Sequence, residues 1–376
     1  MKIAMVSGHT GPPPALGGAD TGGKNVHVAA PADRPGRADR DGVRAAEPPA
    51  EDPGPSQMRL LMLRALGLGD FLTAVPAYRA LRAAFPHHEA VLAAPAALAP
   101  LAALTGAIDR VLPAGELEPV GWAGPPPDVA VDLHGNGPAS HRVVESLNAR
   151  RTMLYASPQA PDVRGPWWDP GEHEVVRWCR LLEWHGVPAD AGDLWLASPG
   201  SSPYAGAVVL HPGAACTGRR WPAERFAAVT RALTGEGHRV VITGTTAERS
   251  LGLRIAATAG LSPAAVLDTG LLDLTALVAS ARAVISNDTG TSHLATAYGT
   301  PSVTLFGPVS PALWGPPPGR PQHVALWHGT GDRPGDAHGA ETDPRLLQIT
   351  VEEVLQATAD VLTRPRDALR ATRSCG

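Results

Sequence analysis

Residues 59–70 read Arg-Leu-Leu-Met-Leu-Arg-Ala-Leu-Gly-Leu-Gly-Asp. Residues 59–66 form a nearly continuous apolar run, which is typical of a strand buried on both faces of a parallel sheet. Gly67 and Gly69 follow, and they allow the backbone to turn sharply where the strand ends. A helix is predicted next, from apolar residues at Phe71, Val75, Tyr78 and Phe85. A β-strand that leads through a glycine loop into a helix therefore opens the fold.

Strands and helices continue to alternate along the chain. The predicted strands are residues 59–66, 129–133, 207–210, 239–243, 283–286 and 302–306. The uncharged residues 90–108 reach the length of a membrane span, but Pro95 and Pro100 would break a helix in lipid. A buried strand near Val91 followed by a short helix is favoured instead. This alternation predicts an α/β protein with βαβ units and doubly wound sheets.

Two domains are expected, because 376 residues exceed what one hydrophobic core usually serves. Residues 197–204, Ala-Ser-Pro-Gly-Ser-Ser-Pro-Tyr, interrupt the periodicity just before an apolar strand, so we place the boundary near Gly200. Residues 58–199 and 200–376 are then two Rossmann-like domains, the second with a C-terminal helix. They should face a cleft at the carboxyl ends of their strands, where ligands of such sheets bind.

Residues 1–57 are predicted to be a disordered or vestigial N-terminal extension. Residues 31–57 hold six prolines and ten charges, and they have too few apolar side chains to bury. No secretory signal is recognised, and three widely spaced cysteines fit a reducing, cytoplasmic location. A net charge of −4 argues against nucleic acid as a partner.

The first candidate site residue is Asp70, at the end of the glycine loop. A carboxylate at a strand end beside a helix start could take a proton from an attacking hydroxyl. The alternative is that Asp70 only caps the helix, which stabilises by about 1 kcal/mol. Two glycines and an acid do not complete the G-x-G-x-x-G pattern, so dinucleotide binding is poorly supported.

The second motif is residues 211–222, His-Pro-Gly-Ala-Ala-Cys-Thr-Gly-Arg-Arg-Trp-Pro. Pro222 suits a first helical position, so Thr217, Arg219 and Arg220 should gather at a helix N-terminus and cradle a phosphate. Arginine offers a bidentate fork to a diphosphate, and the chain has no lysine after residue 24. The alternative is a solvated loop whose arginines face water.

The third and most specific motif is residues 286–295, Ser-Asn-Asp-Thr-Gly-Thr-Ser-His-Leu-Ala. A strand ends and a helix begins here, so the N–H groups of Thr289 and Gly290 should favour an anion. His293 lies one turn further on and could donate to a phosphate oxygen. Two hydroxyl groups add donors, those of Thr291 and Ser292.

For this third motif the alternative is that Asp288 caps the helix and His293 is a buried, satisfied histidine. The next strand ends in Phe306-Gly307-Pro308. The ring of Phe306 could lie against a nucleotide base, and a core phenylalanine is the alternative.

Together these motifs resemble glycosyltransferase family 9, the heptosyltransferases, over about residues 58–364. The resemblance implies the GT-B fold and an inverting transfer without an essential metal or a cofactor. It implies a nucleotide-sugar donor of the ADP-heptose type and a glycan, lipid-linked or small-molecule acceptor, as in lipopolysaccharide or glycan biosynthesis. It also implies peripheral contact with the inner membrane face.

Position by position, the resemblance makes Asp70 the general base. It assigns the donor diphosphate site to Thr217, Arg219, Asp288, Thr289, Gly290 and His293. Asp288 falls on a motif carboxylate near the sugar, and Arg219 stands where the family often has lysine. Glu248 matches a ribose-binding acid and joins Phe306 in the nucleoside site. Residues 132–135, Asp-Leu-His-Gly, look like the acceptor-domain motif.

Residues 1–30 resemble the start of a glycosyltransferase family 4 enzyme, with its Gly-Gly-x-Asn-Val-His element. Nothing else of that family follows, which favours a gene-fusion remnant or a misassigned start codon. Two other functions remain open from the sequence. One is a nucleotide-sugar epimerase or hydrolase on the same fold, and the other is a non-catalytic nucleotide-sugar binding protein.

Overall fold

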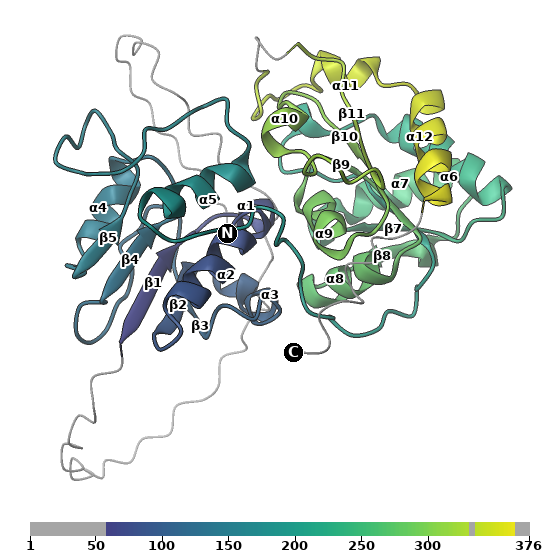
Figure 1. The fold of residues 1–376 in the computed structure, drawn as a ribbon. Coiled ribbons are helices and arrows are strands. Elements are labelled where there is room, and N and C mark those ends of the chain that lie inside the picture. Colours follow the sequence, from purple (N-terminus) through teal and green to yellow (C-terminus); the bar gives the residue numbers. More distant parts are fainter. Residues whose placement is uncertain (1–57, 331–334, 365–376) are drawn as a thin grey trace, which may run out of the picture.

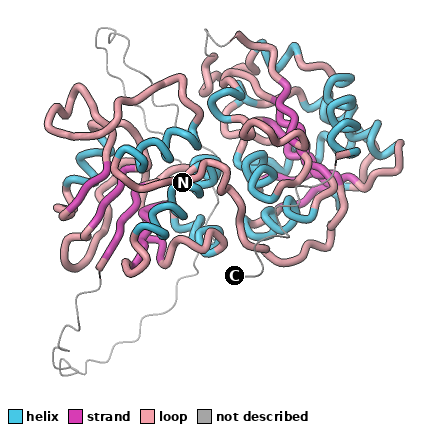
Figure 2. Tube along the Cα trace, viewed as in Figure 1, coloured by secondary structure: helices cyan, strands magenta, loops and turns pink. Residues whose placement is uncertain are grey.

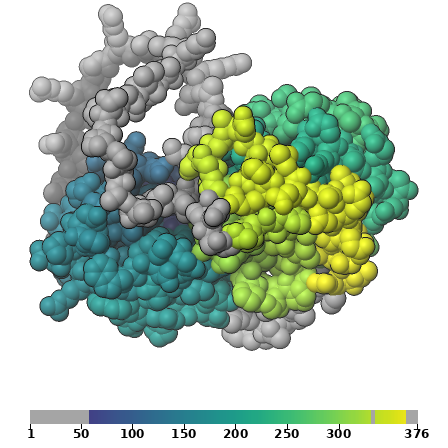
Figure 3. Space-filling view, turned by 90° about the horizontal axis from the view of Figure 1, so that it is seen from above, coloured from purple at the N-terminus to yellow at the C-terminus, as the bar shows by residue number. Residues whose placement is uncertain are grey.

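The computed structural model describes residues 58–330 and 335–364, which form two α/β domains (Figure 1). The predictions made for residues 1–57, with the family 4 resemblance, lie outside the described residues. In the space-filling view the first domain, in teal, lies beside the second, in green to yellow (Figure 3).

The first domain is built on a parallel sheet with the order β3-β2-β1-β4-β5. Its strands are β1 (Arg59–Leu63), β2 (Glu89–Ala94), β3 (Arg110–Pro113), β4 (Val129–Asp132) and β5 (Arg151–Met153). Its helices are α1 (Leu68–Thr73), α2 (Val75–Ala84), η1 (Ala96–Leu98), α3 (Ala99–Ala103), α4 (Ala139–Glu145) and α5 (Glu174–Trp184). The central strand β1 pairs with β2 and β4, in a register that brings Leu63 level with Ala93 and Asp132.

The second domain has a parallel sheet with the order β11-β10-β9-β6-β7-β8. Its strands are β6 (Val208–His211), β7 (Val240–Gly244), β8 (Val266–Asp268), β9 (Ala283–Asn287), β10 (Ser302–Leu305) and β11 (His323–Leu326). Its helices are η2 (Thr217–Arg219), α6 (Ala223–Gly235), η3 (Thr246–Glu248), α7 (Arg249–Ala259), η4 (Pro263–Ala265), α8 (Leu271–Ser280), α9 (Gly290–Tyr298), α10 (Pro311–Trp314), α11 (Pro344–Gln348) and α12 (Val351–Thr363). Helices flank the strands in both domains (Figure 2).

The six predicted strands are confirmed to within a few residues, as are the strand near Val91 and its short helix. The largest error is at the end of β1, which stops at Leu63 and not at residue 66. Arg64 follows, with its side chain turned to polar partners. Of the strands that the structure describes, those not predicted are β3, β5, β8 and β11, and these form the edges of the two sheets.

The apolar core continues across the domain boundary. One buried cluster contains Leu68 and Leu101 of the first domain together with Leu274 and Leu294 of the second. Helix α1 packs on α9, and α3 packs on α8. The carboxyl ends of β1 and β9, which lead into α1 and α9, therefore meet at the junction of the domains. None of the helices in the described ranges is long and apolar enough to cross a lipid bilayer.

Candidate active site

Helices α1 and α9 meet at their first turns, and Gly290 allows the contact. A Cβ atom on Gly290 would lie 2.7 Å from Leu68 Cγ and 2.8 Å from Leu68 Cβ. Any larger residue would push the domains apart, because the clashing atoms are close to the backbone of α1. The first turn of α1 carries Asp70, so this contact places Asp70 beside the start of α9.

Asp70 is the third residue of α1, whose N-cap is Gly67. In the described structure its side chain makes no cap hydrogen bond, so the explanation of Asp70 as a simple helix cap is wrong. The residue is 1% exposed, and its Oδ2 atom has no hydrogen-bond partner among the described residues. A buried carboxyl oxygen without a partner is costly and is characteristic of functional sites.

The proton affinity of Asp70 is set by burial and by two charged neighbours. Arg64 Nη2 lies 3.6 Å from Asp70 Oδ1 and 3.0 Å from Glu174 Oε1. Burial raises the pKa of Asp70 to about 7, against the lowering effect of Arg64, and Glu174 raises it further. At neutral pH the carboxyl group is therefore close to half ionised.

Sequence reasoning missed Arg64 and Glu174. A signal existed for Arg64, because a charged residue interrupts the apolar run of residues 59–66. Glu174 begins α5, more than 100 residues after Asp70, and only the folded chain brings it to Arg64. Its sequence surroundings give no such signal.

The proposed acceptor-domain motif, residues 132–135, follows β4 at the same edge of the first sheet. Asp132 Oδ1 accepts hydrogen bonds from the backbone N–H groups of His134 and Gly135, at 2.9 and 3.3 Å. His141 Nε2 lies 3.9 Å from Asp132 Oδ2. Burial lowers the pKa of His134 to about 4, so its ring is neutral at pH 7. The motif is a rigid turn next to the Asp70 cluster, linked to it because Arg64 Nη1 donates to Leu133 O.

In the second domain Arg219 and Asp288 form a buried ion pair. Arg219 Nη2 donates to Asp288 Oδ2 at 2.7 Å and to the Asp288 carbonyl at 2.6 Å. Arg220 donates to Ala214 O and so holds its own loop together. The alternative of arginines that merely face water is therefore wrong. Pro222 is the N-cap of α6 and not its first residue, because its extended ψ of 135° lies outside the helical range and the helix begins at Ala223.

Asn287 joins the two loops that the sequence assigned to phosphate. Its Nδ2 donates to Pro212 O at 2.8 Å, and its Oδ1 accepts from Trp221 N at 3.0 Å. The side chain is fully buried at the end of β9. Sequence reasoning quoted Asn287 in the motif without giving it a role, although a buried amide at a strand end is well suited to hold a loop.

The start of α9 offers donors to an anion. Thr289 is the N-cap residue, so Asp288 does not cap this helix. The Oγ1 atoms of Thr289 and Thr291 are buried and lack hydrogen-bond partners in the part of the chain that the structure describes. Ser292 is different, because its Oγ donates to Thr289 O at 2.7 Å. Free hydroxyls at a helix N-terminus suit a phosphate group.

His293 is half-buried, and its ring lies edge-on to Trp314 with the ring centroids 6.1 Å apart. Burial lowers its pKa to about 4, against the effect of Asp288. The ring is neutral at pH 7, so it can donate one N–H but carries no charge to an anion.

The remaining predicted residues are Thr217, Glu248 and Phe306, and they differ in exposure and contacts. Thr217 is exposed at the start of η2. Glu248 Oε2 accepts from Thr245 N at 2.9 Å in a capping box, and its side chain covers Gly213. Phe306 is 1% exposed, so its ring packs in the protein and is closed to a base in this structure.

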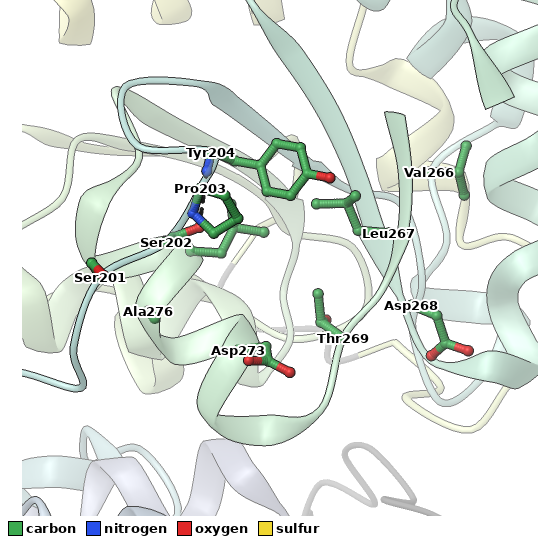
Figure 4. A pocket seen from close by; sticks show the side chains of 11 residues that line it. Ser201, Ser202, Pro203, Tyr204, Val266, Leu267, Asp268, Thr269, Asp273 and Ala276 are labelled. Atoms are coloured by element: carbon green, nitrogen blue, oxygen red, sulfur yellow. Dashed lines mark hydrogen bonds between the residues drawn. The ribbon is translucent and has the colours of Figure 1, made fainter. Parts of the chain in front are cut away.

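A separate pocket of about 330 Å³ lies between the linker and the edge of the second sheet (Figure 4). It is lined by Ser201, Ser202, Pro203, Tyr204, Val266, Leu267, Asp268, Thr269, Asp273, Ala276 and Leu277. The predicted site residues are not part of this lining. In the described ranges, His, Cys, Asp and Glu side chains form no group of three or more that could hold a metal ion.

Comparison with known proteins supports the resemblance. Residues 188–335 match the model of glycosyltransferase family 9 (heptosyltransferase). Lipopolysaccharide heptosyltransferase 1 of Pseudomonas aeruginosa is 34% identical over 157 residues, which are 39% of this chain and 42% of that protein. Lipopolysaccharide heptosyltransferase 2 of Salmonella typhimurium is 31% identical over 152 residues, 39% of this chain and 43% of that protein. The chain thus matches less than half the length of these relatives.

Solved structures share the fold over a longer stretch. The E. coli ADP-heptose lps heptosyltransferase II structure has a TM-score of 0.64 at 22% identity, and covers 81% of this chain and 98% of its own. The structure of E. coli heptosyltransferase WaaC with ADP has a TM-score of 0.60 at 20% identity, and covers 81% and 100%. The expected GT-B fold is confirmed.

Proposed function

From the confirmed resemblance to glycosyltransferase family 9, we propose that this protein is an inverting glycosyltransferase. It moves a heptose-like sugar from a nucleotide diphosphate, ADP-heptose in the first instance, to an acceptor hydroxyl. The observation that carries the proposal is the juxtaposition at the domain junction. A buried carboxyl group with a pKa near neutrality lies beside a helix N-terminus that presents unpartnered hydroxyls.

In the proposed reaction Asp70 is the general base. A base works best when its pKa lies near the working pH, and the pKa of Asp70 is about 7. Its Oδ2 atom, without a partner among the described residues, takes the proton from the acceptor hydroxyl as that oxygen attacks the anomeric carbon. Because this atom is enclosed, the acceptor reaches it only when the surrounding segments move apart.

The leaving diphosphate is held from the second domain. The backbone N–H groups of Thr289 and Gly290 and the hydroxyls of Thr289 and Thr291 donate to its oxygens. His293 adds a neutral donor. Arg219 balances the charge of Asp288, so that the phosphates do not approach an uncompensated carboxylate. Thr217 joins this site from the exposed end of its loop, and Glu248 is proposed for the nucleoside.

The names of the relatives suggest the wider setting of the reaction. Both sequence relatives are lipopolysaccharide heptosyltransferases. We accordingly propose residues 58–199 as the acceptor domain and residues 200–376 as the donor domain. A glycan or lipid-linked acceptor, a cytoplasmic location and peripheral contact with the inner membrane face belong to the same proposal.

Donor binding is the first test. ADP-, GDP- and UDP-sugars are screened for thermal stabilisation, and the best donor is then assayed for sugar transfer with a panel of acceptors. Stabilisation by ADP-heptose followed by acceptor-dependent release of ADP is the expected result. Release of nucleotide without an acceptor would favour an epimerase or hydrolase, and binding without turnover under any condition would favour a binding protein.

A further inference from the structure

Arg64 is held by groups other than the carboxylate of Asp70. Its Nε donates to the Asp70 backbone carbonyl at 3.0 Å, and its Nη2 donates to Glu174 Oε1 at 3.0 Å and Thr73 Oγ1 at 3.3 Å. The distance from Nη2 to Asp70 Oδ1 is 3.6 Å, beyond a good hydrogen bond. All of these groups are buried, and charge interactions are strong in the protein interior. Small differences in distance therefore decide which group Arg64 binds most tightly.

We propose that Glu174 is a positioning residue that draws the Arg64 guanidinium away from Asp70 and so preserves the basicity of Asp70. Two carboxylates compete for one guanidinium, and Glu174 has the shorter contact. Without Glu174, Arg64 Nη2 would be free to form a charge-assisted hydrogen bond with Asp70. Such a bond stabilises the carboxylate and weakens it as a base. This inference rests on the proposed function of Asp70.

Glu174 is itself fixed by its own helix. Trp178 Nε1 donates to Glu174 Oε1 at 2.9 Å, and Arg177 pairs with Oε2. The Arg64 guanidinium also stacks on the Trp178 ring, 4.5 Å from its centroid. The rotamer of Glu174 is therefore locked with its Oε1 atom toward Arg64.

The helix start is also anchored to the second domain. His173, the N-cap of α5, accepts a hydrogen bond from Val175 N at its Nδ1 atom. The other ring nitrogen, Nε2, is then protonated and donates to Gly315 O at 2.9 Å. A hydrogen bond between the domains thus holds His173, the residue immediately before Glu174.

Charged and titratable groups approach Asp70 from every neighbouring element. Arg64 follows β1, Glu174 lies on α5 with Arg177 beside it, and Arg219 belongs to the second domain. From α2, the phenol of Tyr78 has a raised pKa and stays neutral. Arg64 and Arg219 lower the pKa of Asp70, whereas Glu174 raises it. Glu174 is thus the carboxylate that opposes the two arginines.

The test is a direct titration of Asp70 in the full chain. The Asp70 carboxyl carbon is followed by ¹³C NMR against pH, and its signal is assigned by difference with Asp70→Asn. Glu174→Gln should lower the pKa of Asp70 by roughly one unit or more, the effect of a single nearby charge. Glu172→Gln is the matched control, because Glu172 pairs with Arg180 in the same region and should leave the titration unchanged. An unchanged pKa in folded Glu174→Gln would overturn the proposal.

A second variant keeps the proposal testable if Glu174→Gln does not fold. Arg177→Gln removes the second arginine that pairs with Glu174 and should strengthen the hold of Glu174 on Arg64. The pKa of Asp70 should then rise, so the two variants shift it in opposite directions. A fall or no change in Arg177→Gln would contradict the inference.

Transfer assays add a functional readout. Because the ionised form of Asp70 is the active base, the rate of sugar transfer should rise with pH through the pKa of Asp70. Glu174→Gln should move this rise in kcat to lower pH and should lower the maximum kcat, with KM for the donor nearly unchanged. Glu174→Asp keeps the carboxylate and should restore the wild-type pH profile. A merely structural role would reduce thermal stability without shifting the pH profile. If no transfer is found with any donor, the proposed function fails, whereas the NMR titration still decides the role of Glu174.

Discussion

In each domain, the edge of the sheet at which the strands end faces the domain junction. The two edges carry different kinds of polar groups. The edge of the first sheet gathers buried charges, those of Arg64, Asp70 and Glu174. The edge of the second sheet presents backbone N–H groups and the hydroxyls of Thr289 and Thr291, beside the ion pair of Arg219 and Asp288. The difference shows a division of labour, because buried charges shift proton affinity whereas neutral donors bind an anion.

Asp70→Asn is the change with the largest expected effect, because it removes the proposed base of the first domain and leaves the anion-binding groups of the second domain intact. Asn is nearly isosteric but cannot accept a proton at neutral pH. Turnover should fall by roughly 10²–10⁴-fold, the usual contribution of a positioned base. Donor affinity should stay nearly constant, since the second domain holds the donor. Binding by calorimetry and transfer on the same preparation measure the two quantities.

Asp193→Asn is the control for that change, because Asp193 forms an ion pair with Arg79 at 2.8 Å and is not among the groups that act on Asp70. It should leave turnover within a factor of about two, as expected for a partly exposed ion pair. Near-normal turnover of Asp70→Asn would remove the base from the mechanism and with it the contrast between the edges.

Gly290→Ala tests whether the two edges must touch. The added Cβ would lie 2.7 Å from Leu68 Cγ, so α1 and α9 must separate by a fraction of an ångström. Misplacement of reacting groups by about 1 Å can lower the rate by about 10²-fold, so we expect a loss approaching that size. Gly235→Ala is the control, because a Cβ on Gly235 meets open space. Equal activity of the two variants would show that close contact is dispensable.

The central parts of the fold were predictable from the sequence, and its margins were not. Strands such as β1 and β9 are buried on both faces and read as apolar runs. The edge strands β3 and β8 are short and partly exposed, so their sequences lack that signal. A hydrophobic pattern in the sequence indicates burial, and an edge strand is less buried than a central one.

The candidate site divides in the same way. Asp70 and the start of α9 follow strand ends and carry glycine and threonine patterns, so sequence could point to them. Glu174 and Asn287 act through contacts with residues 110 and 75 positions away. Such pairings depend on the tertiary fold, and local sequence does not encode them in a readable form.

Arg219→Ala asks whether the anion-binding edge uses charge at all. Loss of a charge-assisted hydrogen bond should weaken binding of a nucleoside diphosphate roughly 10- to 100-fold, and binding of the nucleoside much less. Part of this loss comes from Asp288, which is left unpaired. The double variant Arg219→Ala/Asp288→Asn should therefore recover part of the affinity. Equal losses for both ligands in Arg219→Ala would remove Arg219 from the phosphate site.

The effect of Asp70 on stability has a sign that reveals its protonation state. Asp70 has a pKa of about 7 when folded, against roughly 3.9 for an unfolded aspartate. Between these values the folded chain binds more protons, so its free energy of unfolding falls as pH rises through this range. Asp70→Asn cannot ionise, so it removes this decrease in the free energy of unfolding. The melting temperature of the variant, relative to that of the wild type, should rise from pH 4 to pH 7 and then level off. Each kcal/mol of difference in the free energy of unfolding corresponds to roughly 2–4 °C.

Asp109→Asn is the control with the opposite sign. Backbone and Arg82 contacts hold the pKa of Asp109 below its usual value, so its carboxylate stabilises the fold above the unfolded pKa. Its loss should lower the melting temperature at neutral pH, and the effect should fade as pH falls below about 4. If Asp70→Asn followed the same trend as Asp109→Asn, Asp70 would be an ordinary ion-pair partner of Arg64. The first edge would then be a structural salt bridge and not a tuned base.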